Sequence, residues 1–364
     1  MIHKVQIQNY KNIRDQKIDL DRLTVFVGPN SCGKTSVLQA IDLAVQADPD
    51  NLDWTDVKNQ EWGWIYTRGG SGDLEIKCET DNGSFGIQVT PPMQFLLPPE
   101  PLGRPRWYVS LTSSRLLKSV ELTKILPLAF VHFNESRLAE ASYSDTLRPQ
   151  LAPDGGGAAS VLAYMALNDP DAFQEFMDHL RILLPQIKRI RFRKAEVRRG
   201  EVESVMIGSD TGERRTIRAF QGEAMLFDFK NATDVAAHTV SEGTLMIVGL
   251  LTVLLGSDRP KTLLMDDIDH GLHPLMQGNL LGLIRKLMEQ FPDLQILATA
   301  HSPYLLDHLE PQQVRLMTTD DNGHAVCGRL NDHPDFERWK DEMAPGELWS
   351  LFGEKWLLER GGAR

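Results

Sequence analysis

Residues 28–36 combine two glycines, a lysine and hydroxyl side chains in the order GPNSCGKTS. Glycines at 28 and 33 let backbone amides approach phosphate oxygens, Lys34 can neutralise the β- and γ-phosphates, and the Thr35 hydroxyl can ligate Mg²⁺. We therefore predict a phosphate-binding loop, with Lys34 also a catalytic candidate. The predicted nucleotide-binding residues of this loop are Gly28, Pro29, Asn30, Ser31, Cys32, Gly33, Lys34, Thr35 and Ser36.

A second group of reactive side chains lies in residues 261–274, KTLLMDDIDHGLHP. The apolar run 262–265 fits a buried parallel strand, and the carboxyl ends of such strands are where open α/β sheets bind ligands. We predict that Asp266 ligates Mg²⁺ with Thr35 and that Asp267 positions or deprotonates the attacking water. Taken alone, the three aspartates would read as a solvated acidic turn.

A histidine ends the next apolar strand, 294–298, in the sequence LQILATAHSP. From this position His301 could donate a hydrogen bond to the γ-phosphate or to the attacking water. A lone histidine is more often structural, but we predict that His301 is catalytic because of its place in the sheet.

The third element is an almost wholly apolar helix over 244–255, preceded by Ser241, Glu242 and Gly243. Ser241 could simply cap the helix. The same residues could also form an anion-binding site. Because the chain already has one phosphate loop, this second site would not be needed for the same nucleotide. A two-fold dimer solves this, because each helix end would then meet the nucleotide bound by the other copy.

These segments resemble the ABC-class ATPase heads of the SMC, RecF and OLD (overcoming lysogenization defect) group. GPNSCGKT is similar to the Walker A motif, VSEGTL to the signature, LLMDDIDHGLHP to Walker B with the D-loop, and ATAHSP to the switch-histidine segment. The GLHP tetrapeptide and the N-terminal IQNYKNI are most similar to the OLD-type branch. The resemblance covers residues 1–50 and about 225–310 well, and the middle poorly.

The resemblance implies ATP and Mg²⁺ as cofactors, a signature of Ser241, Glu242 and Gly243 that acts in trans, and His301 as the switch. The family usually has glutamate where this chain has Asp267. Because aspartate is one methylene shorter, its carboxylate would sit about 1 Å from the productive position, which can cost on the order of 10²-fold in rate. We expect slow turnover and a long-lived ATP-bound dimer.

Strand and helix patterns predict an α/β fold in three sequence segments. Residues 1–135 form the first part of the ATPase lobe, residues 136–257 a second lobe with the signature helix, and residues 258–364 the rest of the ATPase lobe with a C-terminal helix. We expect a mixed sheet core, an antiparallel β subdomain that includes strands at 73–90 and 106–111, and a helical and β second lobe. No heptad run is long enough for a long coiled coil.

A basic stretch, IKRIRFRKAEVRRG, covers residues 187–200. On a strand, Arg189, Arg191 and Arg193 would line one face and could follow a phosphate backbone, while Ile190 and Phe192 would face inward. DNA contact is one interpretation. A solvated strand that faces an acidic partner or a second copy of the chain is the other.

Composition limits the remaining classes. The chain has a net charge of −11, three widely spaced cysteines and no apolar run long enough to span a membrane, so we expect a cytoplasmic protein in a reducing compartment without a membrane partner. Some fifty residues follow the histidine segment and its helix, so we expect no TOPRIM nuclease domain of the OLD kind in this chain.

We therefore expect a dimeric ATPase that acts as a nucleotide-gated clamp or sensor in antiphage defence, with a nuclease or toxin supplied by a separate chain. The alternative is a RecF-like repair ATPase that binds DNA directly. An ABC transporter motor fits less well, because extra residues separate the two ATP motifs, and the guanine-reading NKxD sequence of GTPases is missing.

Overall fold

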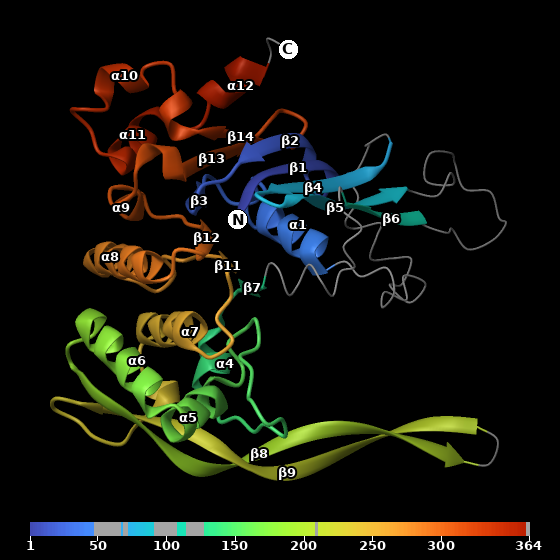
Figure 1. The fold of residues 1–364 in the computed structure, drawn as a ribbon, viewed down its shortest axis with the longest axis vertical. Coiled ribbons are helices and arrows are strands. Elements are labelled where there is room, and N and C mark those ends of the chain that lie inside the picture. Colours follow the sequence, from blue (N-terminus) through green and yellow to red (C-terminus); the bar gives the residue numbers. More distant parts are fainter. Residues whose placement is uncertain (47–66, 68–71, 91–107, 114–126, 208–209, 362–364) are drawn as a thin grey trace. The chain divides into compact units, whose positions relative to one another are not determined.

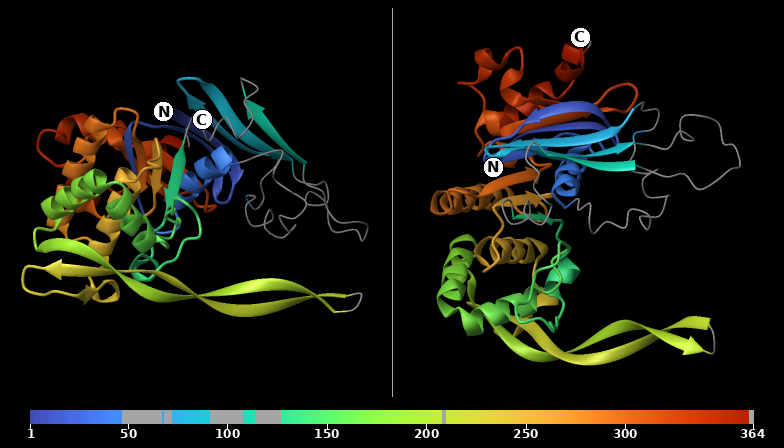
Figure 2. Two further views of the ribbon diagram at one scale, coloured as in Figure 1. Left: turned by 60° about the horizontal axis from the view of Figure 1, so that its bottom comes forward. Right: turned by 45° about the vertical axis from the view of Figure 1, so that its right-hand side comes forward.

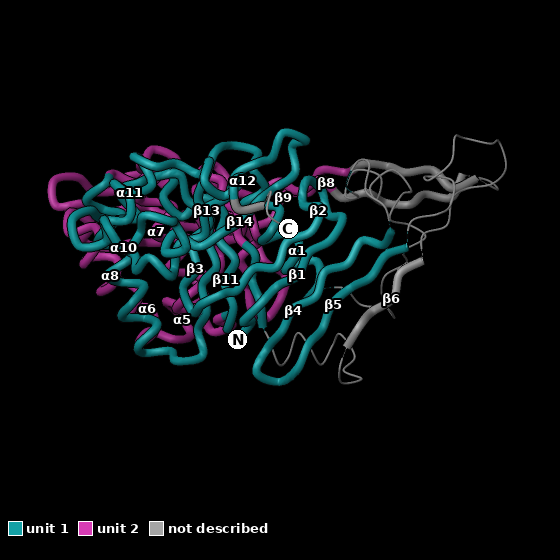
Figure 3. The backbone as a smooth tube through the Cα atoms, turned by 90° about the horizontal axis from the view of Figure 1, so that it is seen from above, with its two compact units in different colours: residues 1–130, 260–270, 274–364 teal, residues 131–259, 271–273 magenta. Residues whose placement is uncertain are grey.

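The computed structural model describes residues 1–46, 67, 72–90, 108–113, 127–207 and 210–361. The described chain divides into two compact units, coloured separately in Figure 3. Unit 1 contains residues 1–130, 260–270 and 274–364, and unit 2 contains residues 131–259 and 271–273.

Unit 1 is built on two sheets (Figure 1). The first is antiparallel, with strand order β2-β1-β4-β5-β6, and the second has the order β14-β13-β3-β12-β11-β7. Their strands are β1 (Ile2–Tyr10), β2 (Ile13–Asp19), β3 (Leu23–Val27), β4 (Leu74–Thr80), β5 (Gly83–Thr90), β6 (Tyr108–Ser113), β7 (Leu128–Val131), β11 (Thr262–Met265), β12 (Gln295–Thr299), β13 (Val314–Thr319) and β14 (Ala325–Arg329).

The second sheet positions the predicted site. Strands β11, β12, β3 and β13 run parallel, and β14 is antiparallel to β13. β3, β11 and β12 are buried along their whole length, which explains why they read as unbroken apolar runs. The helix α1 (Lys34–Gln46) contacts strands of both sheets, and its residues Val37, Leu38 and Ile41 are fully buried in their shared core.

The remaining helices of unit 1 follow the parallel strands and end the chain. They are α8 (Pro274–Gln290), α9 (Pro303–Leu306), α10 (Phe336–Trp339), α11 (Pro345–Phe352) and α12 (Trp356–Gly361). The prediction of one C-terminal helix was wrong, since Gly353 adopts a positive φ of 60° and ends α11 before α12 begins.

Unit 2 combines helices with a long two-stranded ribbon (Figures 1 and 2). Its elements are α4 (Glu135–Ala139), α5 (Ala158–Asn168), α6 (Pro170–Leu183), β8 (Ile187–Ile207), β9 (Asp210–Phe229), β10 (Val235–Ala236), the short 3-10 helix Ala237–Thr239 and α7 (Glu242–Leu255). α7 is buried on nearly all sides because α4, α5 and α6 pack around it. Pro170 at the first turn and the Asp169 carboxylate, which accepts from the Ala172 amide at 3.1 Å, begin α6.

The ribbon pairs β8 with β9 in antiparallel register from Ile187 opposite Phe229 to Ile207 opposite Asp210. Two views show this ribbon continuing beyond the helices of its own unit (Figure 2). Ile190 is buried and the Phe192 ring lies 5.9 Å from the Phe173 ring, as predicted for the inward face.

The predicted α/β class, mixed sheet, antiparallel β subdomain and helical and β second lobe are confirmed. Within the described ranges the longest helix, α8, has 17 residues, and no long coiled coil is present. In the same part of the chain, no helix combines the length and apolar character needed to cross a membrane.

Candidate nucleotide site

The phosphate-binding loop lies between β3 and α1 in unit 1. Gly28 has a φ of 146°, and a Cβ atom there would lie 2.0 Å from the Met317 carbonyl oxygen of β13. Gly33 has a φ of 104°, and a Cβ there would lie 2.9 Å from the Asn12 Oδ1 atom. Both positions therefore require glycine, for backbone conformation and for space.

Lys34 is held inside this loop. Its side chain is buried, and its Nζ donates to the carbonyl oxygens of Gly28 at 2.9 Å and Pro29 at 3.0 Å. The ammonium group thus lies over the loop, where it could exchange these carbonyls for phosphate oxygens. Pro29, Asn30 and Ser31 are exposed on the loop.

Cys32 is buried in the loop, and burial raises the pKa of its thiol, so the protonated form is favoured. A buried, protonated thiol of this kind packs within the loop and is poorly suited to redox chemistry.

The Walker B carboxylates follow β11 at the carboxyl end of the sheet. Asp266 is buried, and its two oxygens accept from the Thr35 hydroxyl at 2.9 and 3.0 Å. A buried carboxylate beside a hydroxyl at a phosphate loop is the hard-oxygen donor set that suits Mg²⁺. Thr35 and Asp266 are therefore the residues that would hold the ion.

Asp267 adopts a left-handed backbone, with a φ of 53°. Its carboxylate oxygen Oδ1 lies 3.3 Å from His301 Nε2. The structure thus brings together residues from three segments of the sequence, since Thr35 contacts Asp266 and Asp267 contacts His301.

Asp269 has a role that the sequence did not indicate. Its Oδ2 atom accepts from the backbone amides of His301 at 3.0 Å and Ser302 at 2.6 Å. The aspartates after β11 are therefore hydrogen-bonded parts of the site and do not form a solvated turn.

The sequence did not indicate the roles of two further residues of the site. Thr299 bridges Asp266 and Asp267, as described below. Asn12 donates from Nδ2 to the Ser31 carbonyl at 3.2 Å. In the sequence, Asn12 was indicated only by its place in the IQNYKNI segment, which resembles OLD-type ATPases.

The signature residues lie in unit 2 at the beginning of α7. Ser241 occupies the N-cap position, but its hydroxyl caps no backbone amide and instead lies 2.9 Å from the Thr244 hydroxyl. The suggestion that capping alone explains Ser241 was therefore wrong. A Cβ at Gly243 would lie 2.4 Å from the Gly271 carbonyl oxygen, so glycine is needed where the D-loop segment passes.

The predicted arginine stripe is largely used within the fold. Arg189 Nε donates to Asp228 Oδ2 at 2.7 Å, and Arg191 Nη2 donates to Asp228 Oδ1 at 2.8 Å and to Asp234 Oδ1 at 2.7 Å. Asp228 is only 1% exposed. The hydrogen bonds from Arg191, the Asp234 amide and Arg189 hold the pKa of Asp228 well below its usual range.

The Asp228 cluster leads to a prediction about stability. We expect Asp228→Asn to lower the melting temperature by on the order of 5 °C near neutral pH, because a buried carboxylate facing two guanidinium groups is replaced by a neutral amide. A carboxyl group with a lowered folded-state pKa stabilises the fold above its unfolded value of about 3.9 and loses that effect as the pH falls. The difference between wild type and variant should therefore shrink below about pH 4, which a series of thermal melts would measure. Glu196→Gln, which removes an exposed carboxylate on the same ribbon, is the control.

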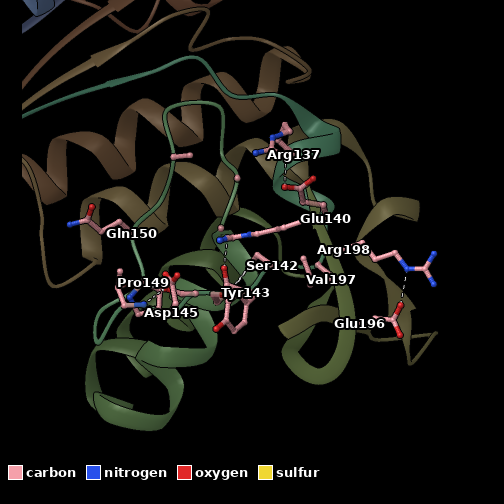
Figure 4. A pocket seen from close by; sticks show the side chains of 18 of the residues that line it. Arg137, Glu140, Ser142, Tyr143, Asp145, Pro149, Gln150, Glu196, Val197 and Arg198 are labelled. Atoms are coloured by element: carbon pink, nitrogen blue, oxygen red, sulfur yellow. Dashed lines mark hydrogen bonds and ion pairs between the residues drawn. The ribbon is translucent and has the colours of Figure 1, made fainter. Parts of the chain in front are cut away.

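Unit 2 also contains a polar pocket of about 770 Å³ between the loop after α4 and the ribbon (Figure 4). Its cations already have partners: Arg137 pairs with Asp154 at 2.8 Å, and Arg198 with Glu196 at 2.8 Å. Arg199 donates to the Tyr143 carbonyl at 2.6 Å and lies over the Tyr143 ring. The three arginines that line the pocket are therefore engaged in contacts within unit 2.

Several protein families and known proteins are similar to this chain. The family model described as "AAA domain, putative AbiEii toxin, Type IV TA system" matches residues 129–307, and the one described as "AAA ATPase domain" matches residues 1–148. The chain is 23% identical over 341 residues to the Septu protein PtuA of Bacillus mycoides, a match that covers 89% of this chain and 41% of that protein. It is also 42% identical over 45 residues to the OLD nuclease of Thermus scotoductus, a match that covers 12% of this chain and 8% of the nuclease. The chain thus spans less than half the length of these relatives.

Two solved structures share the fold. An SMC head bound to the C-winged helix domain of ScpA superposes with a TM-score of 0.58 at 12% identity, covering 92% of this chain and 99% of that one. The head of a Pyrococcus furiosus SMC protein, bound to the C-terminal domain of ScpA, gives a TM-score of 0.52 at 11% identity, covering 93% and 98%. The motifs assembled in this site and the matches to AAA domain models are those of a P-loop ATPase, and the fold is similar to that of an SMC head.

Proposed function

We propose that this ATPase works as a nucleotide-gated clamp or sensor, in which two copies enclose two ATP molecules. In each site the loop at 28–36 of one copy would hold the phosphates, and Ser241, Glu242 and Gly243 of the other copy would meet the γ-phosphate. The observation that carries this proposal is the beginning of α7, where the Ser241 hydroxyl is not used as a helix cap. The nucleotide of the same chain already has its phosphate loop in unit 1.

The catalytic roles follow the geometry of unit 1. Lys34 would bind the β- and γ-phosphates, Thr35 and Asp266 would hold Mg²⁺, and Asp267 would position or deprotonate the attacking water. His301, 3.3 Å from Asp267, would respond to the presence of the γ-phosphate. Turnover would be slow because Asp267 stands where the family usually has glutamate.

We further propose a role in antiphage defence with an effector, a nuclease or toxin, on a separate chain. Two observations support this: the match to PtuA extends over 89% of the chain, and the local match to the OLD nuclease has 42% identity. Copurification from the native host in the ATP-bound state tests it. A stoichiometric effector subunit supports the proposal, whereas DNA with repair factors contradicts it.

Direct DNA binding through Arg189, Arg191 and Arg193 remains the second candidate. It is less well supported because Arg189 and Arg191 are bound to Asp228 and would have to share their charge with phosphates. Arg193 is exposed and forms no ion pair within the described ranges, so one cation of the predicted stripe remains for a phosphate.

The dimer leads to a prediction about mass in solution. In an Asp267→Asn background with ATP and Mg²⁺, we expect light scattering to give twice the 41.0 kDa chain mass. Adding Ser241→Arg should keep the protein at 41.0 kDa while ATP binding persists, because the larger cation would obstruct the contact in trans. Ser136→Arg, at an exposed position on α4, should leave the dimer intact. A dimer that forms normally with Ser241→Arg would exclude the signature contact.

A further inference from the structure

We propose that Thr299 is a positioning residue for ATP hydrolysis, because it holds Asp266 and Asp267 in their working arrangement. Thr299 is the last residue of β12, two positions before His301, and its side chain is fully buried. The inference rests on the proposed roles of Asp266 in Mg²⁺ binding and Asp267 in water activation.

Thr299 contacts three consecutive residues of the Walker B segment. Its hydroxyl lies 2.6 Å from Asp266 Oδ1 and accepts from the Asp267 backbone amide at 2.8 Å. Its carbonyl oxygen accepts from the Ile268 amide at 3.0 Å. One buried residue of the neighbouring strand thus fixes the whole turn that follows β11.

The single hydroxyl proton decides how these contacts are shared. Because the Thr299 oxygen accepts from the Asp267 amide, its one proton remains for a carboxylate. Asp266 Oδ1 at 2.6 Å is closer than Asp267 Oδ1 at 3.3 Å, so the proton is donated to Asp266. This bond fixes the rotation of the Asp266 carboxylate, whose oxygens also face the Thr35 hydroxyl.

The bond to the Asp267 amide has a different effect. A φ of 53° is uncommon for a residue with a side chain, and such a backbone persists only where its surroundings hold it. The hydrogen bond from the Asp267 amide to the Thr299 hydroxyl stabilises this backbone conformation. In this conformation the Asp267 carboxylate lies beside His301. Loss of the hydroxyl would therefore loosen both the proposed metal ligand and the proposed base.

Thr299→Val tests the proposal, since valine keeps the shape of the side chain and removes only the hydroxyl. We expect kcat for ATP hydrolysis to fall by about 10²-fold, because a small misplacement of reacting groups has an effect of this size. The affinity for ATP without metal should change by less than about threefold, because Thr299 does not touch the phosphate loop. The affinity for Mn²⁺ in the presence of ATP, measured by electron paramagnetic resonance, should fall about fivefold or more because the Asp266 carboxylate loses its orienting bond.

Two companion variants make the result specific. Thr299→Ser retains the hydroxyl and should recover kcat to within about tenfold of wild type. Thr262→Val is the matched control, because Thr262 is buried on the adjacent strand β11 and its hydroxyl has no hydrogen-bond partner among the residues that the structure describes. It should leave kcat and Mn²⁺ affinity unchanged.

Unchanged kcat and Mn²⁺ affinity in Thr299→Val would overturn the proposal. So would a loss of metal-free ATP binding that serine does not rescue, because this would indicate a purely structural role. Asp266→Asn separates failure of the inference from failure of its basis: if that variant binds Mn²⁺ like wild type, the metal role of Asp266 is wrong, and the Thr299 proposal falls with it.

Discussion

Lys34→Met is expected to lower kcat/KM for ATP hydrolysis by about 10³-fold or more, because it removes the positive charge that the phosphate loop presents. In the described part of the chain, the Lys34 ammonium donates to the carbonyl oxygens of Gly28 and Pro29, within the loop itself. Methionine keeps the length of the unbranched stem, so the loss measured should be that of the charge and its hydrogen bonds.

Release of inorganic phosphate and binding of a fluorescent ATP analogue measure the two parts of this effect. We expect weaker ATP binding as well as slower hydrolysis, since Lys34 would contact the phosphates before and during the reaction. Lys17→Met, at an exposed position of β2, should behave as wild type. Hydrolysis within about tenfold of wild type in Lys34→Met would contradict the assignment of the loop.

Asp267→Asn is expected to lower kcat by about 10²-fold or more while ATP affinity stays within about threefold. Asparagine tolerates the left-handed backbone that Asp267 adopts, with a φ of 53°, so the turn should survive the change. The amide cannot take a proton from water, and the ATP-bound dimer should therefore persist longer than in wild type.

Single-turnover hydrolysis and the lifetime of the dimer in light scattering measure these two consequences. Asp267→Glu provides the comparison for side-chain length. If the short carboxylate limits the rate, glutamate should raise kcat. Glutamate is less compatible with the positive φ at this position, which reduces the expected gain. Wild-type turnover in Asp267→Asn would show that another group activates the water.

Several parts of this protein could be read from the sequence because they depend on local order. The glycine-rich segment 28–33 joins β3 to α1, and β11 occupies residues 262–265 as expected from its apolar run. Asp266, Asp267 and His301 follow parallel strands, so their convergence at one sheet edge was predictable from the strand pattern. The helix after Ser241 was equally clear, since a helix buried on all sides has no polar face.

Other features depend on partners that are distant in the sequence. The strand predicted at 187–200 extends to Ile207, because pairing with β9 continues until Ile207 lies opposite Asp210. Arg189 and Arg191 donate hydrogen bonds to Asp228, which lies on the opposite strand nearly 40 positions away in the sequence. A charge in the sequence predicts exposure, whereas its partner in the fold decides whether the charge is available to a ligand.

The sequence by itself determined the ATPase class, because glycines, a lysine, carboxylates and a histidine at these spacings match the motif pattern of a P-loop ATPase. Only the tertiary structure decided how that site is held. The buried Thr299 hydroxyl of β12 contacts Asp266 and the Asp267 amide, which follow the neighbouring strand β11. Asp269 accepts from the backbone amide of His301, and the Ser241 hydroxyl does not cap its helix. Such hydrogen bonds depend on distances of a few tenths of an ångström between separate segments, which residue order alone does not specify.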